Sequence, residues 1–216
     1  MPRDSISALI TADHLCHPTL RQRPFTRAGW LFELKHDGFR ALVIKQGRSA
    51  RILSRTGRSM HLGFPELAAS LSELGRDAVL DCELVVPDTE GNSDFEALRQ
   101  RNLLNRSELI VHAAASRPAV LVCFDVLAAR GQDLRSLPLG VRRDWLHANV
   151  SPVRGLQLIE SVETHGEALY QLACEQDREG IVAKRLDSAY RAGRQDCWIK
   201  TKNKAFSRQA AVVWQA

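Results

Sequence analysis

The sequence lacks the features that mark secreted, membrane-spanning and zinc-stabilised proteins. No apolar run is long enough to cross a membrane, and Asp4 interrupts the N-terminal stretch where a signal peptide would need its apolar region. The five cysteines include no C-x-x-C pair, and no histidine cluster stands at zinc spacing. Repeats and low-complexity segments are also missing. These absences favour a cytoplasmic protein, in which Cys82 and Cys123 are expected to be buried, reduced thiols.

The composition is that of a folded domain with a mild basic excess. At 216 residues, with 44% hydrophobic and 25% charged residues, the chain can bury a real core. Its formal net charge of +5 fits a phosphate-rich partner such as nucleic acid, although an arginine-rich proteome would give the same excess. Pro18 and Pro24 break the polar start of the chain. We therefore divide it into an N-terminal arm, residues 1–27, and one domain, residues 28–216.

Alternating and continuous apolar runs, separated by turn residues, predict a strand-rich fold. Strands are predicted over residues 30–34, 41–45, 51–54, 78–86, 119–127, 180–184, 198–201 and 212–214. Asp37-Gly38 predicts a hairpin turn after the first of them. Helices are predicted over 64–74, 139–148 and 168–175, and capping boxes are predicted at Ser93 with Glu96 and at Thr164 with Glu167. Because strict β-α alternation is missing, this order favours an α+β fold with antiparallel or mixed sheets and outer helices.

Five of the strand-associated segments carry charges that a plain core would not accept. They span residues 33–40, 53–57, 81–86, 179–184 and 198–202. A buried charge without a partner is costly, so these charges must pair, lie at sheet edges or face a shared cleft. The cations are Lys35, Arg40, Arg55, Lys184, Lys200 and Lys202, and the acids are Glu33, Asp37, Glu83 and Glu179. Such a cleft could hold phosphates and a metal ion that bridges phosphate and carboxylate.

The same segments form an ordered set of motifs. K-x-D-G-x-R stands at residues 35–40, S-R-x-G at 54–57, D-C-E-L at 81–84, F-D-x-L at 124–127, P-L-x-x-R-R at 138–143, E-G-x-V-x-K at 179–184 and W-x-K-x-K at 198–202. Over about residues 28–204 the set resembles that of the covalent nucleotidyltransferases, and most closely that of bacterial ATP-dependent DNA ligases of the ligase D kind. The resemblance implies two antiparallel sheets packed with flanking helices, an ATP-grasp-like nucleotidyltransferase fold with the nucleotide cleft between the sheets.

The resemblance implies roles for the cations. Lys35 would attack the α-phosphorus of ATP and become covalently attached to AMP. This needs a neutral amine, which partial burial and neighbouring cations favour. Lys200 and Lys202 share one strand face at period two and would both reach the α-phosphate. Arg40 would contact the ribose, and Arg55 the AMP phosphate or the 5′-phosphate of a nick.

The nucleotide's base is expected to lie among three further residues. Glu33 shares a strand face with Lys35 and would accept a hydrogen bond from the adenine amino group, although a cross-strand salt bridge is an alternative. By resemblance, Phe124 would stack on adenine and Val182 would close its other side. Spacing alone favours a core aromatic at Phe124.

Two carboxylates and one more lysine complete the expected site. Glu179 would bind Mg²⁺ or Mn²⁺, and Glu83 would bind the ribose hydroxyl or help to hold that metal. Lys184 matches its motif, yet strict alternation puts it on the strand face opposite Glu179. Cys82 replaces the glycine of the D-G-E-L motif, and its side chain is expected to point away from Glu83 into the sheet packing.

The resemblance also implies a partner and a reaction. AMP would pass from Lys35 to the 5′-phosphate of nicked double-stranded DNA for strand sealing in repair, in a monomer associated with the nucleoid. Family ligases continue into an OB-fold domain, for which too few residues follow Lys202. The chain is thus expected to be a fragment, a minimal protein completed by an OB-fold or end-joining partner, or a ligase-like protein of partial activity. An RNA ligase or capping enzyme, and a non-catalytic nick-binding module, are the alternatives.

Overall fold

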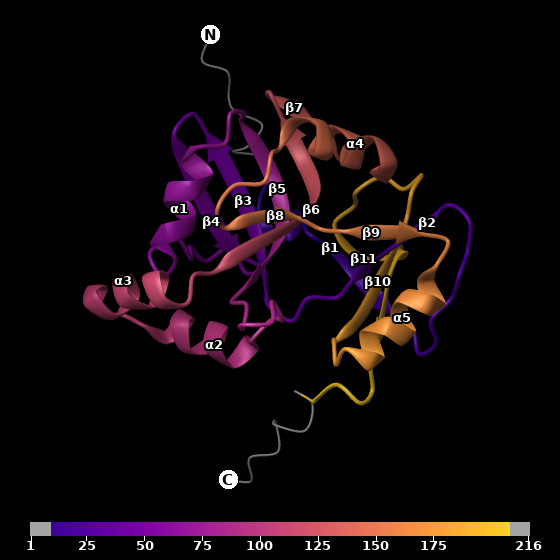
Figure 1. The fold of residues 1–216 in the computed structure, drawn as a ribbon. Coiled ribbons are helices and arrows are strands. Elements are labelled where there is room, and N and C mark those ends of the chain that lie inside the picture. Colours follow the sequence, from indigo (N-terminus) through magenta and orange to yellow (C-terminus); the bar gives the residue numbers. More distant parts are fainter. Residues whose placement is uncertain (1–9, 208–216) are drawn as a thin grey trace.

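A computed structural model describes residues 10–207, and in this part of the chain two β-sheets face each other between outer helices (Figure 1). The first sheet has the order β1 (Cys16–Leu20), β11 (Gly193–Lys202), β10 (Gly180–Arg185), β2 (Trp30–Leu34) and β9 (Ser161–Glu163). The second has the order β4 (Ser49–Ser54), β3 (Phe39–Gln46), β5 (Ala78–Val85), β6 (Val120–Ala129) and β7 (Gln132–Asp133), with β8 (Leu156–Leu158) also beside β6. Pairing is antiparallel except for β1 with β11 and β6 with β8. The predicted α+β fold with two mainly antiparallel sheets is confirmed.

Helices cover the outer faces of both sheets. They are α1 (Pro65–Ser72), α2 (Phe95–Leu103), α3 (Ser107–Ser116), α4 (Leu139–Asn149) and α5 (Gly166–Glu175), with a 3-10 helix at Ala12–His14. Helices α1 and α2 lie on the side of the second sheet, and α5 lies against the first (Figure 1). No helix in the described residues is both long and apolar enough to cross a membrane.

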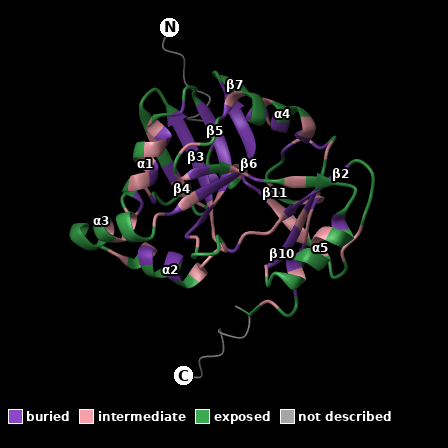
Figure 2. Ribbon diagram, viewed as in Figure 1, coloured by how far each residue is buried: buried purple, intermediate pink, exposed green. Residues whose placement is uncertain are grey.

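Period-two alternation explains why the second sheet is buried on both faces. Along β3, Ala41 and Val43 pack in the cluster that includes the helices, whereas Leu42 and Ile44 pack in the cluster between the sheets. Figure 2 shows β3, β5 and β6 as buried along most of their length. On β5 the same alternation turns Cys82 toward the helices, as predicted. The residues on either side of it therefore face the first sheet.

Residues 10–20, which the sequence analysis places in the N-terminal arm, pack against the first sheet and in the core. Cys16–Leu20 forms the edge strand β1 and pairs in parallel with β11. Leu15 is fully buried, and with Ile10 it packs in the core between the sheets. Strand β1 was not predicted because an edge strand buries only part of its length. Its polar residues and Pro18 therefore give no clear hydrophobic alternation.

The segment after β2 crosses from one sheet to the other instead of closing the predicted hairpin. Strands β2 and β3 have no pairing with each other, since they lie in different sheets. A Cβ on Gly38 would lie 2.3 Å from the Leu84 carbonyl oxygen, so only glycine lets the crossing run against β5. Asp37 and Gly38 therefore lie in the segment that connects the two sheets, beginning two residues after Lys35.

Two helix starts differ from the predicted capping boxes. Asp94, not Ser93, is the N-cap of α2, and its carboxylate accepts the Ala97 N–H at 2.9 Å. The Thr164 hydroxyl donates to the Glu163 carbonyl, and α5 begins after His165 without a side-chain cap. Helix α3 was not predicted, because none of its residues is buried and it carries no helical burial pattern. The strand predicted over residues 212–214 lies outside the described residues.

Candidate active site

A cleft of about 750 Å³ opens between the two sheets. Most of the residues predicted for the site line it, namely Glu33, Lys35, Arg40, Arg55, Glu83, Phe124, Glu179, Val182, Lys184 and Lys200. Lys202 is the exception and lies at the end of β11 with 45% of its side chain exposed. The tertiary structure thus gathers segments that are far apart in the sequence into one concave site.

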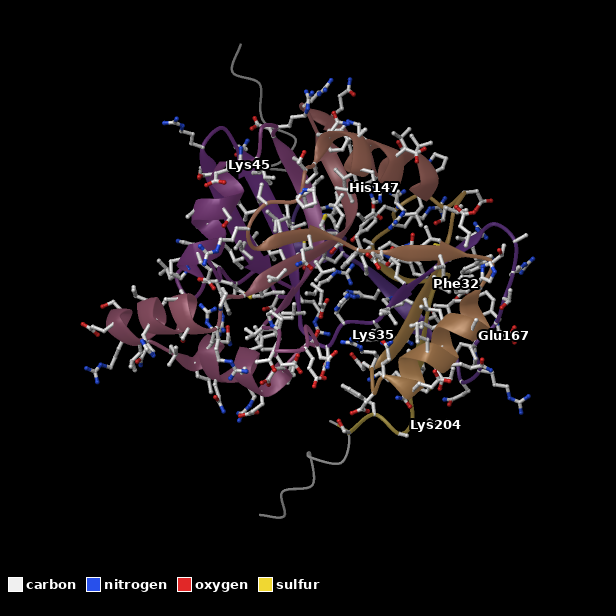
Figure 3. The ribbon with its side chains drawn as sticks, viewed as in Figure 1. Phe32, Lys35, Lys45, His147, Glu167 and Lys204 are labelled. Carbon is white, nitrogen blue, oxygen red and sulfur yellow. The ribbon has the colours of Figure 1, made fainter. Side chains whose placement is uncertain are left out.

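Lys35 stands at the junction of the two sheets, immediately after β2 (Figure 3). Its backbone N–H donates to the Gly180 carbonyl oxygen at 2.9 Å, which fixes the main chain against β10. Its Nζ lies 2.5 Å from Glu179 Oε2, and its side chain is 22% exposed. The amine is therefore held inside the cleft and remains accessible to a ligand there.

The neighbouring carboxylates and lysines give this part of the cleft strong local charge. Burial, reinforced by the charges of Glu179 and Asp81, raises the pKa of Glu83 to about 7 even though Lys35 and Arg40 oppose the shift. Burial and then the positive charges of Lys35 and Lys202 lower the pKa of Lys200. A bound cation would stabilise the charged form of Glu83, and a bound phosphate would stabilise that of Lys200.

The two carboxylates of the cleft, Glu83 and Glu179, could hold a hard divalent cation only together with further oxygen ligands from water or phosphate. Within residues 10–207, no group of three His, Cys, Asp or Glu side chains could hold a metal ion by itself. Glu83 and Glu179 line the same cleft, and carboxylate oxygens suit Mg²⁺, which commonly keeps water or phosphate ligands as well. Glu83 and Glu179 are thus the residues that could hold a metal ion, which would supply positive charge in this part of the cleft.

Glu179 and Lys184 line the cleft together, so the prediction that they lie on opposite faces is wrong. Strict alternation requires extended backbone throughout, and Gly180 departs from it with a φ of 136°. This break in the alternation lets Glu179 line the cleft that Val182 and Lys184 also line.

At the other end of the cleft, Glu33 is held by two cations. Its Oε1 accepts from Arg143 Nη1 at 2.7 Å, and its Oε2 lies 2.6 Å from Lys184 Nζ. Glu33 is only 1% exposed, and burial lowers the pKa of Lys184 although Glu33 opposes that shift. The salt bridge weighed as an alternative is present, while Glu33 also lines the cleft.

Phe124 belongs both to the core between the sheets and to the cleft wall. The Arg40 guanidinium lies 4.7 Å and the Lys184 Nζ 4.2 Å from its ring centroid, and Trp198 packs edge-on at 6.0 Å. Val182 pairs in register with Glu33 across β10 and β2. The core reading of Phe124 is therefore correct, and its position is compatible with a base in the cleft.

The sequence analysis gave no role to three supporting residues, Asp81, Arg143 and Tyr190. Asp81 binds Arg40 through both oxygens, at 2.5 and 2.6 Å, and accepts a hydrogen bond from the Tyr190 hydroxyl at 2.5 Å. An acid that interrupts an apolar strand was a usable signal for Asp81. Arg143 ends the P-L-x-x-R-R motif and could have been suspected, whereas nothing local marks Tyr190.

The fold is that of the nucleotidyltransferase domain of ATP-dependent DNA ligases, and comparison with known proteins agrees. The model of the ATP-dependent DNA ligase domain matches residues 16–202. The chain belongs to this family and carries an ATP-dependent DNA ligase domain.

Relatives in this family come from bacterial end-joining and ligase C proteins. The chain is 35% identical to the multifunctional non-homologous end joining protein LigD of Pseudomonas aeruginosa, over 82% of this chain and 20% of that protein. It is 34% identical to DNA ligase C1 of Mycolicibacterium smegmatis, over 81% of this chain and 51% of the relative. Among solved structures, mycobacterial DNA ligase D complexed with ATP matches with a TM-score of 0.68 and 30% identity, over 86% of this chain and 60% of that one. The chain thus spans between a fifth and about half of these two relatives' lengths.

Proposed function

We propose that the cleft loads AMP from ATP onto Lys35, with Mg²⁺ held between Glu83, Glu179 and the phosphates. The observation that carries this proposal is the position of the Lys35 amine, 2.5 Å from Glu179 in a cleft that also exposes Glu83 and Lys200. Nucleophile, carboxylates and cations converge there, and this is the set that phosphoryl transfer requires.

In the proposed first step, Lys35 Nζ gives up a proton to solvent water in the open cleft and then attacks the α-phosphorus. A nitrogen–phosphorus bond forms, the bond from the α-phosphorus to the bridging oxygen breaks, and pyrophosphate leaves with that oxygen. Glu179 accepts from the amine and holds it at the α-phosphorus, while Lys200 stabilises the charge that shifts onto the phosphate oxygens. The metal supplies further charge neutralisation at these oxygens.

Two later steps would complete strand sealing on nicked double-stranded DNA. An oxygen of the nick's 5′-phosphate attacks the phosphorus of lysyl-AMP, and the Lys35–phosphorus bond breaks. The 3′-hydroxyl then attacks that 5′-phosphate, loses its proton, and AMP leaves. Arg55, at the cleft rim, supports a contact with the DNA phosphate. At the base end, Glu33 would accept the adenine amino group, and Phe124 and Val182 would flank the ring.

The test of the loading step uses ATP labelled at the α-phosphate together with Mg²⁺. We expect the label to stay with the denatured protein, to be released by acid as a phosphoramidate, and to be absent from Lys35→Ala. Lys204→Ala is the matched control, because Lys204 is exposed and is not among the residues that line the cleft, and it should label like the wild type.

Pre-adenylated nicked DNA tests sealing separately from loading. Sealing without loading would indicate partial activity, in which AMP is used but not taken from ATP. Label that persists in Lys35→Ala would contradict the assignment of the nucleophile. A preference for GTP or for RNA ends would favour a capping enzyme or an RNA ligase instead.

A further inference from the structure

Glu179 reaches the cleft through a turn that strand pairing alone does not produce. Gly180 opens β10 with a φ of 136°, and a Cβ there would lie 2.1 Å from the Thr201 carbonyl oxygen of β11. The main chain at Gly180 is therefore pressed against β11 in a conformation that few other residues adopt. Such a turn needs contacts of its own to keep one orientation.

Asn203 supplies these contacts from the far end of β11. It is only 3% exposed, and its backbone N–H donates to the Glu179 carbonyl oxygen at 2.9 Å. Its side-chain Nδ2 donates to the Arg178 carbonyl oxygen at 3.1 Å, and its Oδ1 accepts from the Ala205 N–H at 2.9 Å. One buried amide residue thus binds both carbonyl groups that precede Gly180.

We propose that Asn203 is a positioning residue that sets the direction in which the Glu179 carboxylate enters the cleft. Two carbonyl groups held in place fix the peptide planes on either side of the Glu179 Cα, and hence the direction of its Cβ. That direction brings the carboxylate to 2.5 Å from Lys35 Nζ. The catalytic meaning of this contact rests on the proposed function, whereas the geometric claim does not.

The first test compares Asn203→Ala with a matched amide elsewhere in the fold. Asn149 Nδ2 likewise donates to a backbone carbonyl, that of Trp145 at 2.8 Å, and Asn149 does not line the cleft. Calorimetric titration of ATP at stepped Mg²⁺ concentrations should give a half-saturating Mg²⁺ concentration raised by about tenfold or more in Asn203→Ala. Asn149→Ala should match the wild type, and equal values for both variants would overturn the proposal.

A double-mutant cycle with Glu179→Gln then separates positioning from general loosening of the fold. If Asn203 acts through Glu179, Asn203→Ala should weaken Mg²⁺-dependent ATP binding in the wild type and add little in Glu179→Gln. Fully additive losses would mean that Asn203 acts independently of that carboxylate. Asn203→Asp keeps the acceptor for Ala205 and removes the donor to Arg178, so it should reproduce the loss even if Asn203→Ala folds poorly.

A crystal structure of Asn203→Ala gives a readout that needs no nucleotide. We expect the Arg178–Glu179 peptide to rotate and the distance between Lys35 Nζ and the Glu179 carboxylate to exceed that of an ion pair. An unchanged ion pair would refute the proposal whatever the enzyme assays give. If ATP binds but Lys35 is not labelled, the proposed function is contradicted. The positioning role of Asn203 is then decided only by the distance between Lys35 Nζ and the Glu179 carboxylate in this crystal structure.

Discussion

The two ends of the cleft handle buried charge in opposite ways. At the base end, the end proposed to bind adenine, Glu33 is almost fully buried and has a cation on each oxygen, Arg143 at 2.7 Å and Lys184 at 2.6 Å. At the phosphate end, Glu83 has no ion pair within the described residues, and its pKa is raised to about 7, mainly by burial. The chain itself balances the charge of Glu33, whereas Glu83, unlike its neighbour Glu179, would gain a partner for its charge only from a bound cation.

The largest expected effect is a loss of stability when the charge of Glu33 at the base end is removed. Glu33→Gln removes the charge that compensates Arg143 and Lys184, and the free energy of unfolding should fall by about 3 kcal/mol. Denaturant titration measures the change. Glu96→Gln is the control, because its pair with Arg99 has both side chains 55% exposed, and its unfolding midpoint should stay at the wild-type value. Equal shifts of the unfolding midpoint in Glu33→Gln and Glu96→Gln would contradict the view that the buried pairs of Glu33 matter more than an exposed pair.

A pH series on Glu83→Gln sharpens the contrast at the phosphate end. A carboxyl pKa raised from 4.5 to about 7 means that the native state keeps its proton to higher pH than the unfolded state. The contribution of Glu83 to the free energy of unfolding should therefore fall as pH rises from 4.5 to about 7, and Glu83→Gln should lack this fall.

The difference between wild type and variant is the quantity to measure in that series, because His36 acts in the opposite direction. Burial, aided by Arg178 and Lys35, lowers the pKa of His36 from 6.5 to about 4, so its contribution to stability rises with pH between these values. If the difference in the free energy of unfolding between wild type and Glu83→Gln stays constant from pH 4.5 to 7, the raised pKa of the half-buried Glu83 is contradicted.

The smallest expected effect is at the rim of the cleft. Lys202 Nζ lies 3.2 Å from Glu179 Oε1, but 45% of the Lys202 side chain is exposed. Lys202→Ala should therefore change the free energy of unfolding by less than about 1 kcal/mol, as is usual for solvated pairs. A loss as large as that of Glu33→Gln in the same denaturant titration would show that the rim pair is structural.

Local pattern predicted the strands of the cleft walls well. The range 30–34 matches β2, and the apolar run over 119–127 lies within or next to β6. Hydrophobic periodicity did not predict elements that are only partly buried, such as the edge strand β1. It also did not predict α3, a helix with no buried residue. Hydrophobic periodicity reports burial, so elements with little burial carry little signal.

The candidate site shows the same division. The charged motifs named every ionisable residue proposed above for binding or chemistry, because charges within apolar strands are costly unless they serve a cleft or a pair. The sequence pattern did not predict which residues bind these charged side chains. Arg143 binds Glu33 across 110 positions of sequence, and Tyr190 binds Asp81 across 109. Contacts between residues so distant depend on how the two sheets pack, which no local window contains.

The sequence by itself determined which strand faces are apolar, which segments carry the reactive charges and which family the motif order resembles, because each is a property of neighbouring residues. Only the tertiary structure decided that β2 and β3 lie in different sheets, that β1 belongs to the first of them, and that Glu179 shares a face with Lys184. The physical reason is that these outcomes depend on packing between distant segments. Gly180 is the clearest example, since only the position of β11 puts the Thr201 carbonyl oxygen 2.1 Å from where a Cβ would lie.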